Sequence, residues 1–139
     1  MTIVLATSNA RYAHTAFGLR YLQANLKEMS SRARLLEFDL SVRPLDVIEA
    51  ILDKRPSIVA FSVAIWNVAR LTDVVVTLKK LRPDLPIVLG GPELLAAADC
   101  APTDKLSDGP SSLLGKIGAD LPPLVASADH IIAGEGQLA

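Results

Sequence analysis

The stretch Ile87-Val88-Leu89-Gly90-Gly91-Pro92-Glu93 decides the fold of this chain. Its apolar residues stop at two glycines, and a proline and a glutamate follow. This order predicts a buried strand that leaves a sheet at its carboxyl end and turns into a helix with proline at its first position. Adjacent glycines leave backbone without side chains, so a ligand has room to lie against it. A glycine pair that only makes a tight turn is the simpler alternative, and the rest of the chain has to decide between the two.

The composition is that of one globular domain. The chain has 139 residues, half of them apolar and 21% charged, which is enough for a core and unlike a disordered segment. The formal net charge is −1 and the basic residues are scattered, so nothing indicates a nucleic-acid surface. No apolar run is long enough for a membrane span, and the first residues, 1–6, are too few to form the apolar region of a signal peptide. The single cysteine, Cys100, excludes an internal disulfide and favours a cytoplasmic protein.

Apolar spacing predicts strands that alternate with helices. The predicted strands are 3–6, 35–40, 58–63, 87–89 and 130–133, and the predicted helices are 12–29, 44 to about 54, 68 to about 81, and 93–98. The stripes expected to face the core are Tyr12, Ala16, Leu19, Leu22, Leu26 and Met29, then Leu45, Ile48 and Leu52, then Val68, Leu71, Val75 and Leu78. Residues 100–127 are rich in Pro, Gly, Ser and Asp, which predicts an irregular surface insertion with at most a short helix near 111–117.

This alternation predicts a parallel sheet between two layers of helices, an α/β three-layer sandwich. Residues 35–40 alternate between apolar and acidic side chains, which is typical of an edge strand, whereas residues 3–6 are uniformly apolar and therefore central. The expected strand order is 2-1-3-4-5, the flavodoxin-like (Rossmann-like) arrangement. A ligand should then lie at the switch point, above residues 7–11 and 64–67.

Familiar catalytic sites are missing from the sequence. No G-x-G-x-x-G follows the first strand, and there is no Walker loop or nucleophile elbow. His14 and His130 lack the spacing of metal ligands. A receiver domain would need acidic residues after the first strand and a phosphoacceptor aspartate after the third, and neither is present. Residue chemistry alone therefore predicts a binding module with no catalytic residues and no protein metal site.

Four motifs fall in order along the chain. Thr15-Ala-Phe-Gly-Leu-Arg-Tyr-Leu22 is similar to Pro-Pro-x-Gly-Leu-x-Tyr-Leu, and residues 58–62 are similar to a third strand that ends in Ser or Thr. Residues 89–93 resemble a Gly-Gly-Pro turn, and residues 129–136 resemble Asp-x-Val-Val-x-Gly-Glu-Gly. Together they resemble the N-terminal cobalamin (vitamin B12)-binding domain of cobalamin-dependent radical S-adenosylmethionine proteins. The stretches 9–14 and 61–67 resemble one subgroup of these proteins.

The resemblance implies that a corrin ring lies across the strand ends, with its dimethylbenzimidazole tail between the third and fourth strands and their helices. The residues it assigns to cobalamin are Asn9, Tyr12, His14, Ser62, Val63, Trp66, Asn67, Gly90, Gly91, Pro92, Glu93, Gly134 and Glu135. Ser62 offers a hydroxyl to a ring nitrogen of the tail, and the alternative is a hydroxyl bonded to its own backbone. Trp66 either packs on the corrin or covers the edge of the core.

The cobalt-ligating motif D-x-H-x-x-G of other cobalamin domains is not reproduced. If Gly18 takes the glycine position, Ala13 and Thr15 occupy the Asp and His positions. His14 is one residue out of register, which on a helix is a rotation of about 100°. The resemblance therefore implies base-off cobalamin with no protein histidine on cobalt. It also leaves open a degenerate domain that binds no cofactor.

In the family, a barrel with a C-x-x-x-C-x-x-C iron–sulfur motif and S-adenosylmethionine follows the cobalamin domain. We therefore expect residues 1–139 to be one cobalamin-binding domain, the N-terminal fragment of a radical S-adenosylmethionine methyltransferase whose barrel lies downstream in the same chain. The fragment alone should not be catalytic, and its exposed docking patch would allow it to dimerise. The alternative is a flavodoxin-like interaction domain that docks the barrel without cofactor.

Overall fold

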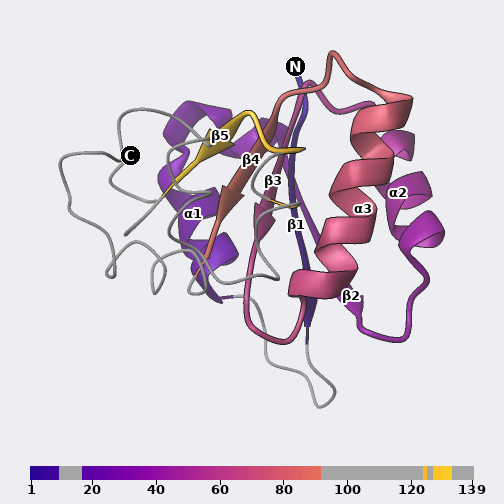
Figure 1. Cartoon of the computed structure of the whole chain (residues 1–139). Helices are drawn as coiled ribbons and strands as arrows, with labels where there is room; N and C mark the ends of the chain where they lie inside the picture. Colours follow the sequence, from indigo (N-terminus) through magenta and orange to yellow (C-terminus); the bar gives the residue numbers. More distant parts are fainter. Residues whose placement is uncertain (10–16, 92–123, 125–126, 133–139) are drawn as a thin grey trace, which may run out of the picture.

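The computed structural model of the chain describes residues 1–9, 17–91, 124 and 127–132. Its centre is one five-stranded sheet with the order β2-β1-β3-β4-β5, in which every neighbouring pair is parallel (Figure 1). The strands are β1 (Ile3–Asn9), β2 (Ala33–Asp39), β3 (Ile58–Ser62), β4 (Ile87–Gly90) and β5 (His130–Ile131). The predicted strand order is confirmed, with β2 at the edge and β1 inside.

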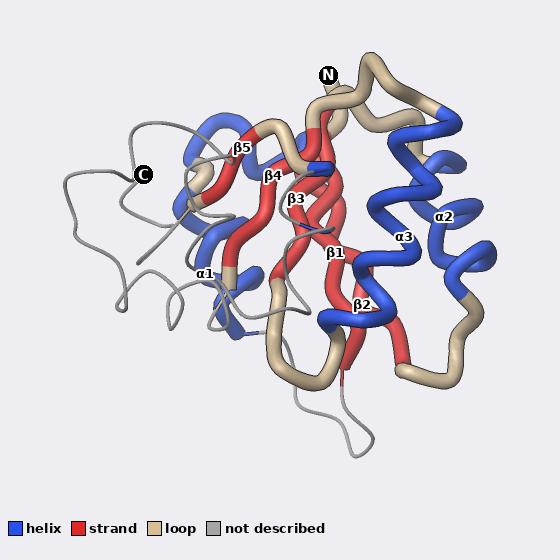
Figure 2. The backbone as a smooth tube through the Cα atoms, in the orientation of Figure 1, coloured by secondary structure: helices blue, strands red, loops and turns tan. Residues whose placement is uncertain are grey.

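Helices lie on both sides of the sheet, as Figure 2 shows. One side carries α1 (Phe17–Asn25), which the short 3₁₀ helix η1 (Lys27–Arg32) follows. The other side carries α2 (Pro44–Asp53) and α3 (Val68–Leu81), which pack against each other as well as on the sheet. The predicted three-layer, flavodoxin-like architecture is confirmed. None of the helices in the described ranges is long and apolar enough to cross a membrane.

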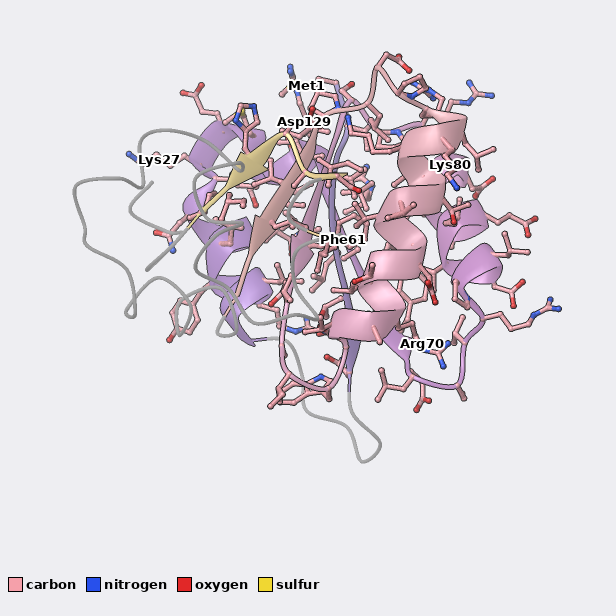
Figure 3. The ribbon with its side chains drawn as sticks, in the orientation of Figure 1. Met1, Lys27, Phe61, Arg70, Lys80 and Asp129 are labelled. Carbon is pink, nitrogen blue, oxygen red and sulfur yellow. The ribbon has the colours of Figure 1, made fainter. Side chains whose placement is uncertain are left out.

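The sheet contributes side chains to two separate cores, because successive side chains of a strand point to opposite faces. The larger core lies under α2 and α3, and Phe61, which is 1% exposed, sits near its middle (Figure 3). Burial of a side chain of this size contributes about 1.5–3 kcal/mol. The smaller core, around Leu19 of α1, takes Ile3 and Leu5 from the opposite face of β1.

The helix stripes are only partly as predicted. In α3 the predicted stripe is confirmed, because Val68, Leu71, Val75 and Leu78 are all buried. In α2 the prediction for Leu45 is wrong, since its side chain is 66% exposed. The buried residues there are Val47, Ile48 and Ile51, which share one side of a helix with 3.6 residues per turn, whereas Leu45 points away from it.

The first helix is shorter than predicted. It ends at Asn25, because Lys27 takes a left-handed backbone conformation with φ of 52° that an α-helix cannot continue through. Met29, predicted to face the core, lies in η1 and is 43% exposed. By contrast, β1 is longer than predicted, because it pairs with β2 as far as Asn9 opposite Asp39. The expected helix at 93–98 and nearly all of the insertion at 100–127 lie outside the described residues.

Candidate functional site

Three strands end together at the switch point of the sheet. β1 ends at Asn9, β3 at Ser62 and β4 at Gly90, and α1 and α3 leave β1 and β3 on opposite faces. Ligands of open α/β sheets bind in the crevice at such a point. Of the predicted site residues, the structure brings together Asn9, Ser62, Val63, Trp66, Asn67, Gly90 and Gly91. The others, Tyr12, His14, Pro92, Glu93, Gly134 and Glu135, lie outside the described residues.

Ser62 and Gly90 form a register pair at the ends of β3 and β4. The residue before each of them, Phe61 and Leu89, is buried under α2 and α3. Ser62 therefore faces the α1 side, as Ala60 does two residues earlier. Its side chain is half-buried, and none of the hydrogen bonds found within the described ranges uses its hydroxyl. This leaves the hydroxyl available to a ligand on the α1 side of the sheet.

The two glycines have different surroundings. A Cβ added to Gly90 would lie 3.7 Å from the carbonyl oxygen of Ile132, which is an ordinary contact. A Cβ added to Gly91 would lie 2.5 Å from the carbonyl oxygen of Val63, and the φ of Gly91 is 115°. Gly91 is therefore required by the path of the chain, which is the tight-turn alternative. Gly90 is not required by its described neighbours, so only Gly90 offers bare strand backbone that a ligand can use.

Asn67 is 0% exposed and its side-chain amide is used inside the protein. Its Nδ2 donates toward the carbonyl oxygens of Ser8 and Ser62, at 3.1 and 3.2 Å, and toward Thr7 Oγ1 at 3.3 Å. Its Oδ1 accepts a hydrogen bond of 2.8 Å from the backbone nitrogen of Ala64. Direct contact of Asn67 with cofactor stays a prediction, and in this structure its polar atoms already have protein partners.

The Trp66 side chain is anchored through its indole nitrogen and is otherwise partly exposed. Its Nε1 donates a hydrogen bond of 3.2 Å to the carbonyl oxygen of Ser8, while 49% of the residue is exposed. The neighbouring Ile65 is 76% exposed. Trp66 also forms one wall of a hollow of about 430 Å³, together with Leu40, Pro44, Ala69, Arg70 and Asp73. The loop between β3 and α3 thus presents an apolar surface beside the strand ends.

Sequence reasoning missed Thr7 and Ser8 as site residues, because the predicted strand ends at residue 6. Both are buried in β1, and the Ser8 hydroxyl has no hydrogen-bond partner within the described part of the chain. Thr7 Oγ1 donates to the carbonyl oxygen of Ser62 at 3.1 Å. Polar residues directly after an apolar strand were the only available signal, and it does not distinguish a loop from a strand end.

Among the described residues, the charged groups with displaced pKa values lie outside this crevice. On the exposed start of α2, a hydrogen bond from Arg43 Nε at 2.8 Å lowers the pKa of Asp46. Within the described ranges, no three His, Cys, Asp or Glu side chains gather closely enough to hold a metal ion. The described part of the crevice thus offers hydrogen-bonding groups, backbone and apolar surface, which suit binding rather than proton transfer.

Residues 3–103 match the B12 binding domain family. The chain belongs to the B12-binding domain family. Among curated proteins, no sequence matches it. This B12-binding domain is similar in fold to a cobalamin-binding protein from Desulfitobacterium hafniense DCB-2, with a TM-score of 0.54 and 15% identity over 96% of this chain and 54% of that one. The methanol:cobalamin methyltransferase complex MtaBC from Methanosarcina barkeri matches with a TM-score of 0.47 and 16% identity, over 89% of this chain and 50% of that one. The chain therefore spans about half the length of these two solved structures.

Family membership implies cobalamin as the cofactor, and the described residues fit it. The Ser62 hydroxyl has no partner in the described ranges, and the adjacent Gly90 leaves strand backbone bare on the same face. Beside them, Ile65 and Trp66 supply exposed apolar surface. A large flat macrocycle with a nucleotide tail can be bound by these elements.

Proposed function

We propose that this B12-binding domain holds cobalamin at the carboxyl ends of β1, β3 and β4, with the nucleotide tail on the α1 side of the sheet. One observation carries the proposal. The available hydroxyl of Ser62 lies in register with Gly90, a position where the described neighbours leave room for a Cβ and yet the residue is glycine. In most strands a glycine weakens the sheet, so its presence suggests a close approach of another group.

The proposed roles follow from the positions of the residues. Ser62 donates its hydroxyl hydrogen to a ring nitrogen of the tail, and Gly90 lets the tail lie flat against β4. Ile65 and Trp66 contact the edge of the corrin, which removes apolar surface from water. Cobalamin supplies a cobalt centre able to carry a methyl group. The protein contributes the binding surface and excludes water from it.

The cofactor is held base-off, because the tail occupies the slot beside Ser62. No histidine replaces the base, since His14 does not register with D-x-H-x-x-G. The parent protein is a radical S-adenosylmethionine methyltransferase whose barrel, downstream in the same chain, holds the iron–sulfur cluster and S-adenosylmethionine. The motifs at 15–22, 58–62, 89–93 and 129–136 support this part of the proposal.

Titration with hydroxocobalamin, followed by absorbance, tests the binding. We expect saturable binding that Ser62→Ala weakens by about 2- to 10-fold, as loss of one hydrogen bond would. Gly90→Val should weaken it more, because a branched side chain fills the tail's path. Ser57→Ala is the matched control, since Ser57 is exposed at the opposite end of β3 and its backbone nitrogen bonds Thr2.

Electron paramagnetic resonance of the reduced cobalt tests the axial ligand. The spectrum should lack nitrogen splitting and should be identical in His14→Ala. Splitting that disappears in His14→Ala would make His14 the ligand. If the chain joined to its barrel binds no cobalamin at all, the interaction domain that docks a barrel without cofactor becomes the function.

A further inference from the structure

The side chain of Asn67 joins the carboxyl ends of β1 and β3. Its Nδ2 lies within 3.1–3.3 Å of oxygen atoms of Ser8, Ser62 and Thr7. Thr7 adds a second link, because its Oγ1 donates to the same Ser62 carbonyl oxygen at 3.1 Å. These are the two strands between which the switch crevice opens. One amide therefore bridges the crevice from below.

This is an unusual use of an asparagine at that position. Asn67 is the N-cap residue of α3, where an asparagine oxygen commonly accepts from the first helical turn. Here the side chain makes no such cap bond, and Oδ1 accepts from Ala64 instead. A buried amide whose donors and acceptor all have partners holds one geometry, because each broken bond leaves a desolvated polar group. The loop between β3 and α3 is therefore fixed at both of its ends.

Two groups of the proposed cobalamin site depend on this network. The Ser62 carbonyl is held by Thr7 and Asn67, which fixes the peptide that carries the Ser62 hydroxyl. The Ser8 carbonyl accepts from both Asn67 and the Trp66 indole, which fixes the aromatic wall beside the crevice. Asn67 itself is 0% exposed, and its side-chain amide is bonded to protein groups.

We propose that Asn67 is a positioning residue for the nucleotide tail of cobalamin, with Thr7 as its partner. It sets where the Ser62 hydroxyl stands relative to the end of β1, and it does so without contacting the cofactor. This role rests on the proposed function, because it presupposes that the tail lies beside Ser62.

The test compares cobalamin with cobinamide, a corrinoid that lacks the nucleotide tail. The wild-type chain should bind cobalamin more tightly than cobinamide. Asn67→Ala should reduce this preference by about 10-fold or more, and Thr7→Val by about 2- to 5-fold, because each removes hydrogen bonds to the Ser62 carbonyl. Asn25→Ala is the matched control and should keep the full preference, since within the described ranges its exposed amide bonds only the Tyr21 carbonyl, at 2.8 Å.

A second readout needs no cofactor. Trp66 is the single tryptophan of the chain, so intrinsic fluorescence reports on its surroundings alone. In Asn67→Ala the emission should shift to longer wavelength, because the loop that carries the indole is released. Thr7→Val, which keeps the shape of the side chain, decides the matter if Asn67→Ala does not fold.

The outcomes separate the two proposals. If the wild-type chain prefers cobalamin and both variants keep that preference within about twofold while only their melting temperatures fall, Asn67 is merely structural and the positioning role is wrong. If the wild-type chain binds neither corrinoid, or binds both equally, the proposed tail site is wrong and the positioning role falls with it. Loss of preference in both variants, with Asn25→Ala unchanged, supports the role.

Discussion

Gly91 lies against the backbone of Val63, with no room for a side chain between them. An added Cβ would stand 2.5 Å from the Val63 carbonyl oxygen and 2.6 Å from its nitrogen. The Val63 nitrogen meanwhile donates a hydrogen bond of 2.6 Å to the Gly90 carbonyl, so the chain leaves β4 across the end of β3. This contact makes Gly91 a residue of the fold, and it leaves Gly90 as the glycine of the proposed ligand site.

Gly91→Ala should therefore destabilise the cofactor-free protein by about 2–3 kcal/mol, because alanine must adopt a strained backbone conformation and clash with Val63. Gly90→Ala should change the free energy of unfolding by less than about 1 kcal/mol, since its Cβ makes only ordinary contacts. Urea unfolding of both variants measures the difference. Equal losses would mean that the two glycines do not have separate roles.

Asp129 joins α3 to the sheet at the end opposite the crevice, where Figure 3 labels it. Its Oδ2 lies 2.6 Å from Lys79 Nζ and accepts from the Ile87 nitrogen at 2.8 Å. Partial burial acts to raise the pKa of Asp129, but the bonds from Lys79 and Ile87 outweigh it, and the net pKa is lowered. A lowered folded-state pKa contributes stability above the unfolded value of about 3.9, and this is lost as the pH falls through the folded-state pKa.

Asp129→Asn should thus lower stability at pH 7 and have little effect once the pH has fallen below the folded-state pKa of Asp129. The carboxylate is 39% exposed, so solvent screening limits the contribution of the ion pair to about 1 kcal/mol or less. Urea unfolding midpoints of the wild-type protein and Asp129→Asn, from pH 7 downward and at low and high salt, measure the stability gap between them. A gap that stays constant down to the lowest pH would show that the ionised carboxylate is not responsible.

Arg55 follows α2 in a left-handed conformation, with φ of 50°, and its nitrogen donates to the Leu52 carbonyl at 3.0 Å. Glycine has no Cβ to oppose this conformation, so Arg55→Gly should raise the free energy of unfolding by about 0.5–1 kcal/mol. Lys54→Gly is the control, because Lys54 has φ of −78° and should lose stability instead. Thermal unfolding of both variants measures these changes. A stabilised Lys54→Gly would refute the argument that the positive φ of Arg55 is the cause.

Gly18 lies in the first turn of α1, and nothing within the described ranges lies within 4 Å of an added Cβ. Gly18→Ala should therefore stabilise the cofactor-free protein by about 0.5–1 kcal/mol, which is the helix preference of alanine over glycine. Ala24→Gly, an exposed change in the same helix, should have the opposite sign. A destabilised Gly18→Ala would reveal a neighbour at that face of α1.

Apolar periodicity along the sequence determined the architecture. Alternation in residues 35–40 placed β2 at the edge, and the uninterrupted apolar run at 3–6 placed β1 inside, because burial on one face or two leaves different local patterns. The sequence determined the ends of the strands less well, since the extension of β1 to Asn9 depends on its pairing with β2. The exposure of Leu45 likewise depends on how α2 is turned on the sheet.

The roles of individual residues at the crevice were decided only by the tertiary structure. Thr7 and Ser62 are 55 residues apart in the chain, and Thr7 and Asn67 are 60 apart, yet each pair shares a hydrogen bond. Local sequence carries no information on such contacts, because they form only when the sheet brings β1 beside β3. For the same reason the two adjacent glycines looked equivalent, and the backbone of Val63 alone separates Gly91, which the turn requires, from Gly90, which a ligand can use.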